Sequence, residues 1–236
     1  MELPKNEYSD NPLYTQEAFM KKTVVFLMAM VFLLCIDVHA EDQWKLAKES
    51  EGIKVYTEKD PQGKDFAIFK GVCEVDAPWE VVLEVLKDQP SYTKWFPNCK
   101  ECRLIKRDEK NNSVIYMVIS PGWPVADRDV VFYTLNYESP EKGEHTISLN
   151  YIKDSDGIVP RNKDYVRMLD IGGGYVLTKI NKNKTTVAFT NRSDLGGNIP
   201  VSLVNFMAVD IPFKSLKGIR EMVKKDEYYK KAGVQK

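Results

Sequence analysis

The sequence predicts one α+β domain, in which an antiparallel sheet is followed by a long helix near the C-terminus. Short runs of alternating apolar and polar residues recur from residue 53 to residue 191, and polar turns separate most of them. Their spacing of about 8–12 residues is typical of antiparallel strands. After Pro200 the apolar residues take the spacing of a helix for about 25 residues. No internal repeat, linker or low-complexity stretch follows residue 40, so residues 41–236 are expected to form a single domain.

The domain is expected to begin with a short helix and two strands. Trp44–Glu49 is assigned to the helix, which Gly52 would close. Ile53–Thr57 and Phe66–Val75 alternate as half-buried strands do, and the Asp-Pro-Gln-Gly sequence at residues 60–63 supplies the turn between them.

A helix is expected directly after these strands. Asp76 is its candidate N-cap, and Val82, Val85 and Leu86 fall on one face of the helix. Pro90 would end it, because proline has no N–H to continue the helical hydrogen bonds.

Seven further strands are expected before residue 192. They are Cys102–Arg107, Val114–Ile119, Asp129–Tyr137, Thr146–Ile152, Tyr165–Leu169, Tyr175–Ile180 and Thr185–Asn191. Gly172–Gly174 precedes a strand and not a helix, so it offers no row of free helix N–H groups to a phosphate. We interpret it as a turn or bulge that lets the sheet curve.

The closing helix is expected to lay an apolar face on the sheet. The residues of that face are Leu203, Phe206, Met207, Ile211, Leu216, Ile219 and Val223. Pro212 interrupts the helix and predicts a kink or short bend. Phe206 and Met207 fit either the wall of a ligand cavity or plain core, and the pattern alone favours core.

The first 40 residues have the features of an export signal. Two lysines precede the apolar run Val24–Ile36, which is shorter than the roughly 20 residues that a membrane-spanning helix needs. Because Val-His-Ala then offers a small-residue cleavage site, we expect residues 20–40 to be a signal peptide cut after Ala40. Residues 1–19 are interpreted as an extension from a misplaced start. The mature protein is then expected in the periplasm or outside the cell.

Composition and motifs argue against nucleic-acid binding and against several enzyme classes. Lys plus Arg and Asp plus Glu number 34 each, whereas nucleic-acid binders usually carry a basic excess. The sequence has no G-x-S-x-G, H-E-x-x-H, Walker or G-x-G-x-x-G motif. No catalytic, cofactor or metal site is therefore predicted.

Three polar features remain, and each has a structural interpretation. His145, the single histidine after residue 40, is expected on the solvated surface. Cys99 and Cys102 form one C-x-x-C, which offers too few ligands for zinc, and a disulfide between them is left open. In Asp127-Arg128-Asp129 two acids flank an arginine, which favours an ion pair supporting the sheet over an acid–base dyad.

Several segments resemble START domains, the lipid-transfer domains related to the steroidogenic acute regulatory protein. Pro121–Asp129 is similar to their P-W-P-x-x-x-R-D segment. Asn191–Asn205, followed by Asp210–Leu216, is similar to the D-x-G-G-x-I-P…N…D-x-P…T-L stretch of bacterial members. Tyr92–Pro97 and Gly52–Tyr56 also follow the family pattern, and the segments occur in the family's order.

The resemblance extends from about residue 43 to residue 231 and implies a helix-grip fold. In that fold a curved antiparallel sheet wraps around a long C-terminal helix and leaves a lipid-sized cavity. The expected function is non-catalytic, exported binding and transfer of a lipid or other hydrophobic ligand by a monomer that contacts membranes transiently. Arg128 and Asp129 would be structural, and the loop Asp154–Asn162 would move with the helix. The residues expected to line the cavity are Tyr116, Phe132, Thr134, Leu203, Phe206, Met207 and Ile211.

One position departs from the sterol-carrying members of the family. These place an inward arginine where Thr134 stands and an acid on the preceding strand, but Val114–Ile119 contains no acidic residue. Sterol specificity is therefore not implied. Two other functions remain open: a periplasmic sensor whose ligand stabilises a partner-binding form, and a cyclase or hydrolase built on the same fold.

Overall fold

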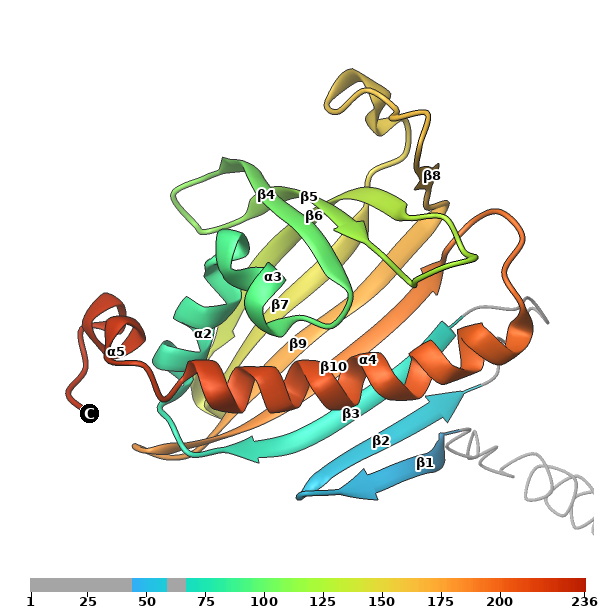
Figure 1. The fold of residues 1–236 in the computed structure, drawn as a ribbon. Helices are drawn as coiled ribbons and strands as arrows, with labels where there is room; N and C mark the ends of the chain where they lie inside the picture. Colours follow the sequence, from blue (N-terminus) through green and yellow to red (C-terminus); the bar gives the residue numbers. More distant parts are fainter. Residues whose placement is uncertain (1–43, 59–66) are drawn as a thin grey trace, which may run out of the picture. The chain divides into compact units, whose positions relative to one another are not determined.

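The computed structural model describes residues 44–58 and 67–236. It confirms the expected fold class: ten strands form one curved, largely antiparallel sheet, and a long C-terminal helix lies across it (Figure 1). The expected signal segment 1–40, the turn at residues 60–63 and Phe66 lie outside the described residues. Within the described ranges, none of the helices combines the length and the apolar character needed to cross a bilayer.

The sheet contains all the strands expected from the alternating pattern and one more at its N-terminal edge. The strands are β1 (Lys45–Ser50), β2 (Ile53–Glu58), β3 (Ala67–Val75), β4 (Cys99–Arg107), β5 (Ser113–Ile119), β6 (Arg128–Ser139), β7 (Glu144–Tyr151), β8 (Val166–Arg167), β9 (Asp170–Asn181) and β10 (Lys184–Asp194). They are ordered β1-β2-β3-β10-β9-β7-β6-β5-β4, while β8 pairs in parallel with the start of β6. Along β10 buried and half-buried residues alternate without exception, which is the period that predicted it.

Helices and short 3-10 turns connect and flank the strands of this sheet. The helices are α2 (Trp79–Lys87), α3 (Tyr92–Trp95), α4 (Val201–Met222) and α5 (Asp226–Ala232), with single 3-10 turns η1 (Gln89–Ser91), η2 (Pro140–Lys142) and η3 (Ser155–Gly157). Val82, Val85 and Leu86 of α2 are buried, as their spacing predicts. The α-helix ends before Pro90, which lies in η1.

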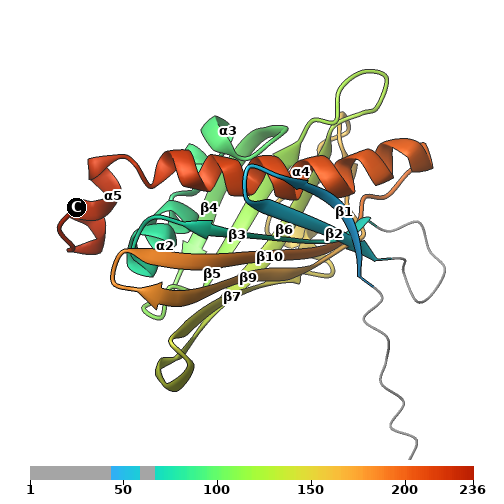
Figure 2. The ribbon, with the colours of Figure 1, turned by 90° about the horizontal axis from the view of Figure 1, so that it is seen from below.

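α4 runs across one side of the sheet and packs mainly on β2 and β3 (Figure 1, Figure 2). Gly71 of β3 permits this approach, because an added Cβ there would lie 2.8 Å from Leu216 and 3.0 Å from Pro212. Gly218 of α4 does the same towards α3, where a Cβ would lie 2.6 Å from the carbonyl oxygen of Trp95. The helix continues through Pro212 from Val201 to Met222.

The expected helix at Trp44–Glu49 is wrong, since this segment forms β1. Glu51 and Gly52, with φ angles of 53° and 68°, make a tight two-residue turn that returns the chain into β2. Positive φ at both central residues is the geometry that hairpins favour. The alternation in β1 is hard to see because most of its residues are polar or exposed.

The expected N-cap at Asp76 is also wrong. α2 begins later, at Trp79, with Pro78 in the capping position and no side-chain cap. The Asp76 carboxylate, just after β3, instead lies 3.4 Å from the ammonium of Lys184 on the neighbouring strand β10.

Gly173 and Gly174 lie inside β9 rather than in a turn. Their φ angles are 117° and 148°, and an added Cβ would overlap the carbonyl oxygens of Thr190 and Ile147 on the two neighbouring strands. Only glycine fits the backbone at these two positions, so Gly173 and Gly174 serve the packing of the sheet.

Candidate ligand-binding cavity

A cavity lies between the sheet and the helices α3 and α4. About 1030 Å³ of space, the open mouth included, is unfilled by protein atoms. Most aliphatic and thioether side chains of its wall come from β5, β6, β7, α4 and the β8–β9 segment, and two leucines come from α2 and from the segment after β10: Ile115, Met117, Ile119, Val130, Ile147, Leu149, Met168, Ile171, Met207, Ile211, Leu86 and Leu195. The surface that a ligand would meet is therefore mainly apolar.

Aromatic side chains form one wall of this cavity. Tyr175 of β9 and Phe189 of β10 stack with ring centroids 4.3 Å apart, and Phe69 meets Phe189 edge to face at 5.2 Å. The Tyr175 hydroxyl is buried and has no hydrogen-bond partner within the described part of the chain. Burial raises the pKa of Tyr175 well above its ordinary value. The hydroxyl is a neutral polar group that a ligand can satisfy.

Four of the residues expected at the cavity line it. Phe132 and Thr134 lie two residues apart on β6 and face inward, and Met207 and Ile211 lie four residues apart on α4. Both spacings keep a pair on one face of its element.

Tyr116, Leu203 and Phe206 do not line the cavity. Tyr116 lies on the opposite face of β5, where its hydroxyl donates to Asp129 Oδ2 at 3.3 Å. Burial, followed by the nearby Asp129 charge, raises the pKa of Tyr116 to about 12. Leu203 packs against the core near the start of α4, and Phe206, one residue before Met207, is rotated outward and 59% exposed.

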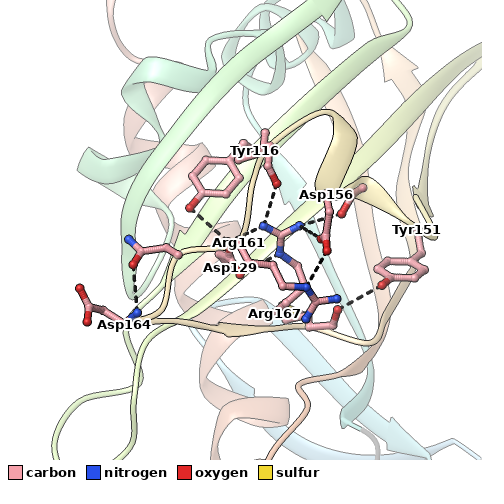
Figure 3. A network of polar contacts seen from close by, with 11 residues as sticks. Tyr116, Asp129, Tyr151, Asp156, Arg161, Asp164 and Arg167 are labelled. Carbon is pink, nitrogen blue, oxygen red and sulfur yellow. Dashed lines mark hydrogen bonds and ion pairs between the residues drawn. The ribbon is translucent and has the colours of Figure 1, made fainter.

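A buried ion pair joins Asp129 to Arg167 on the outer face of the sheet (Figure 3). Arg167 Nε and Nη2 donate to the two carboxylate oxygens, each at 2.9 Å, and both side chains are only 2% exposed. Buried charges are costly unless they are paired and fully hydrogen-bonded, and this two-point geometry meets that condition.

Arg167 also holds the loop after β7 against this outer face. Its Nη1 donates to Ser155 Oγ at 2.8 Å, and its Nη2 donates to the Val159 carbonyl at 3.1 Å. Apolar residues of the loop and of the sheet pack together beside the ion pair: Ile152, Val159 and Tyr165 with Val114, Tyr116, Val118 and Val131. The loop Asp154–Asn162 therefore covers the face opposite the cavity and not the cavity itself.

Asp127-Arg128-Asp129 does not form the expected internal ion pair. Asp127 pairs with Lys100 at 2.6 Å, and Asp129 pairs with Arg167. Arg128 is buried and donates to the Ala126 carbonyl oxygen. Arg128 and Asp129 do not pair because successive residues of a strand point to opposite faces of the sheet.

His145 is buried, which corrects its expected place on the solvated surface. Its Nε2 lies 3.1 Å from Asn136 Oδ1, and its ring stacks on Trp79 with centroids 5.2 Å apart. Burial lowers the pKa of His145, while Glu138 raises it and Lys87 lowers it further.

Cys73, Cys99 and Cys102 are free thiols in the structure. Cys99 Sγ donates to the Glu101 carbonyl at 3.4 Å, and its hydrogen bond with Cys102 lowers the pKa of the Cys99 thiol. Among the described residues, no group of three or more His, Cys, Asp or Glu side chains could hold a metal ion.

Exposed apolar side chains occur at the end of the sheet where α4 begins. Trp123 in the β5–β6 connection is 96% exposed, and Leu169, Val201 and Phe206 are each about half exposed. The segments carrying them meet there, since Val166 pairs with Arg128 and the Leu169 N–H donates to the Asp194 carbonyl at 2.9 Å.

The family model of the START domain matches residues 28–227, most of the chain. The chain belongs to the START domain family. It is 31% identical over 199 residues to the uncharacterized Pseudomonas aeruginosa protein PA1579, and the alignment covers 84% of this chain and 95% of that protein. It is 27% identical to human START domain-containing protein 10 over 77% of this chain and 61% of that one, so it spans about three fifths of that relative.

Solved START structures share the fold. A STAR-related lipid transfer protein fragment from Xanthomonas axonopodis superposes with a TM-score of 0.70 at 29% identity, covering 78% of this chain and all of the fragment. Human StAR-related lipid transfer protein 5 superposes with a TM-score of 0.68 at 18% identity, covering 90% and 99% of the two chains, which shows the fold alone.

Two features of this START domain are not predicted by the sequence patterns. The first is Arg167, whose partner Asp129 lies 38 residues earlier in the chain. The feature that could have indicated a buried role is its position between the apolar residues Val166 and Met168. The second is Arg107, which lines the cavity from the end of β4. Nothing in its exposed, highly charged strand distinguishes it, because inward orientation depends on the bulges of β4.

Replacing Arg167 with leucine is expected to lower the free energy of unfolding by about 3–5 kcal/mol, because Asp129 would stay buried without its partner. Urea unfolding measures this. Lys100→Gln, which breaks a more exposed pair, should leave stability nearly unchanged. Equal effects of the two substitutions would contradict the assigned role.

Acidification is expected to destabilise the fold through His145. Burial lowers the pKa of His145 in the folded state. Its contribution to the free energy of unfolding is therefore fully present above the unfolded-state pKa of about 6.5, and it is lost as the pH falls through the lower pKa of the folded state. The stability difference between the wild type and His145→Gln should shrink from about pH 7.5 to about pH 5. A difference that is constant with pH would show that this histidine does not titrate differently on folding.

Proposed function

We propose that this START domain binds a lipid or another long hydrophobic molecule in its cavity and carries it, as a monomer, without chemical change. The observation that carries the proposal is the apolar cavity enclosed by the sheet and α4. Burying a sixteen-carbon chain is worth roughly 12 kcal/mol at about 0.8 kcal/mol per CH₂. An apolar enclosure can therefore offset the cost of taking such a chain out of a bilayer. The Xanthomonas relative, named as a lipid transfer protein, supports the same function.

The lining of the cavity supports binding over catalysis. Within the described ranges its wall contains no His, Cys, Asp or Glu, the side chains that most often act as general base or nucleophile. The lysine at its edge, Lys87, pairs with Glu84 at 2.6 Å.

We further propose that the end of the molecule carrying Trp123, Leu169, Val201 and Phe206 contacts membranes during transfer. Exposed apolar side chains on adjoining loops suit transient insertion at a bilayer surface, and aromatic rings favour the interfacial region. The start of α4 belongs to this end, so membrane contact and access to the cavity would be coupled.

Export is the remaining part of the proposal. The pattern of residues 20–40 supports a signal peptide cut after Ala40, which would deliver the mature chain to the periplasm or beyond.

Mass measurement of the protein from the periplasmic fraction should give a chain that starts at Glu41, whereas an intact N-terminus would oppose export by cleavage.

Purified protein from cells expressing the full chain is expected to carry a bound lipid. Native mass spectrometry, followed by solvent extraction, should find close to one equivalent, because the apolar cavity wall is poorly suited to water. Protein that is empty and also takes up no fluorescent long-chain probe would overturn the carrier proposal.

Replacing Trp123 with serine is expected to slow lipid transfer between vesicles severalfold while leaving equilibrium binding of a monomeric probe unchanged. The side chain is 96% exposed, so its loss removes membrane contact and little packing. Tyr137→Ser is the matched control, because Tyr137 is 54% exposed on the far half of β6. Equal transfer rates for both variants would oppose a membrane role for Trp123.

A further inference from the structure

We propose that Arg107 makes the cavity selective for amphiphiles with an anionic headgroup, a carboxylate or a phosphate. This inference rests on the proposed function and names its ligand class. The hydrocarbon chain would occupy the apolar part of the cavity, and the headgroup oxygens would accept hydrogen bonds from the guanidinium.

Arg107 lines the cavity at the end of β4 and is held there by neutral acceptors. Its Nε donates to Ser113 Oγ at 3.0 Å, and its Nη2 donates to the Lys87 carbonyl at 2.8 Å and to Gln89 Oε1 at 2.6 Å. These bonds fix the guanidinium plane and leave the N–H groups of Nη1 for a ligand.

The charge of Arg107 has no counterion in the described part of the chain. No acidic side chain lines the cavity. Asp108, its neighbour in sequence, is committed to the β4–β5 turn, where it accepts from the Lys110 and Asn112 backbone N–H groups and from the Asn112 side chain, each at 2.9 Å. A partly buried cation with only neutral acceptors is incompletely stabilised, and an anionic ligand would supply what is missing.

The polar and apolar parts of the cavity wall are arranged along the strands. Arg107, Ser113 and Thr134 are cross-strand partners in one row over β4, β5 and β6. The inward pairs that follow along β5 and β6, Ile115 with Phe132 and Met117 with Val130, are apolar. On β4, β5 and β6 the wall is therefore polar at one end and apolar along the rest. An amphiphile, with a polar headgroup and a hydrocarbon chain, matches this arrangement.

The other polar groups of the wall are uncharged or paired: the Tyr175 hydroxyl is neutral, and Lys87 pairs with Glu84 at 2.6 Å. Asn191 and Ser193 of β10 hydrogen-bond to each other. The guanidinium of Arg107 is the charged group suited to oxyanions, since its planar fork matches carboxylate and phosphate oxygens.

The test measures ligand preference by displacement of a neutral reporter, a fluorescently labelled long-chain alcohol. The competitors are hexadecanoate, hexadecyl phosphate, hexadecan-1-ol and inorganic phosphate, at about pH 8 and below micelle formation. The wild type should bind both anionic amphiphiles at least about tenfold more tightly than the alcohol, the difference that a charged hydrogen bond supplies. Inorganic phosphate should not displace the reporter.

Variants then assign the preference to Arg107. Arg107→Gln should bring all three amphiphiles to within about threefold of one another, with the affinity for the alcohol unchanged. Arg107→Lys should restore part of the preference. Lys106→Gln, which removes the same charge from the neighbouring exposed residue of β4, should behave as the wild type.

The outcomes separate this inference from the proposed function. Equal affinities of the wild type for the anions and the alcohol, or a preference that survives in Arg107→Gln, would overturn the inference and leave the carrier function in place. Displacement by inorganic phosphate would mark a free-phosphate site and also overturn it. If neither the reporter nor any amphiphile binds, the carrier function fails with it.

Discussion

The placement of α4 determines the rest of this molecule. The helix lies close to β3 at Gly71 and close to α3 at Gly218, and its main contacts are with β2, β3 and α3. It is thereby held over one side of the sheet, while the inward faces of β5, β6 and β7 are not filled by it. The cavity is the space that this arrangement leaves, so two contacts that only glycine permits control the room available to a ligand.

Most of the fold could be predicted from local sequence because each strand buries one face. The alternation of β10 and the apolar face of α2 are visible in the residues themselves. β1 is not predicted by its sequence because it is an edge strand with mostly exposed residues. Without a buried face, its residues show little alternation of apolar and polar side chains. The tight turn at Glu51 and Gly52, and not the pattern of the strand, determines its pairing.

The candidate site was harder to predict because it depends on contacts between distant segments. Phe132 and Thr134 could be placed by counting along one strand, but counting from Asp129 says nothing about Arg167. Tyr116 was assigned to the wrong face since aromatic character does not reveal the direction of a side chain. Arg107 is held inward by its hydrogen bonds to Lys87 and Gln89. These residues lie 20 and 18 positions earlier in the chain, and only the tertiary fold brings them beside Arg107.

The two faces of β5 and β6 carry separate tasks, and this has a consequence for how the protein can diversify. Ile115 and Met117 face the ligand space, whereas Tyr116 and Val118, between and beside them, hold the outer loop. Neighbouring positions of a strand thus meet different packing requirements. Exchanges at alternate positions can reshape the ligand space while the attachment of the loop persists, so binding preference can evolve on this scaffold without loss of the fold.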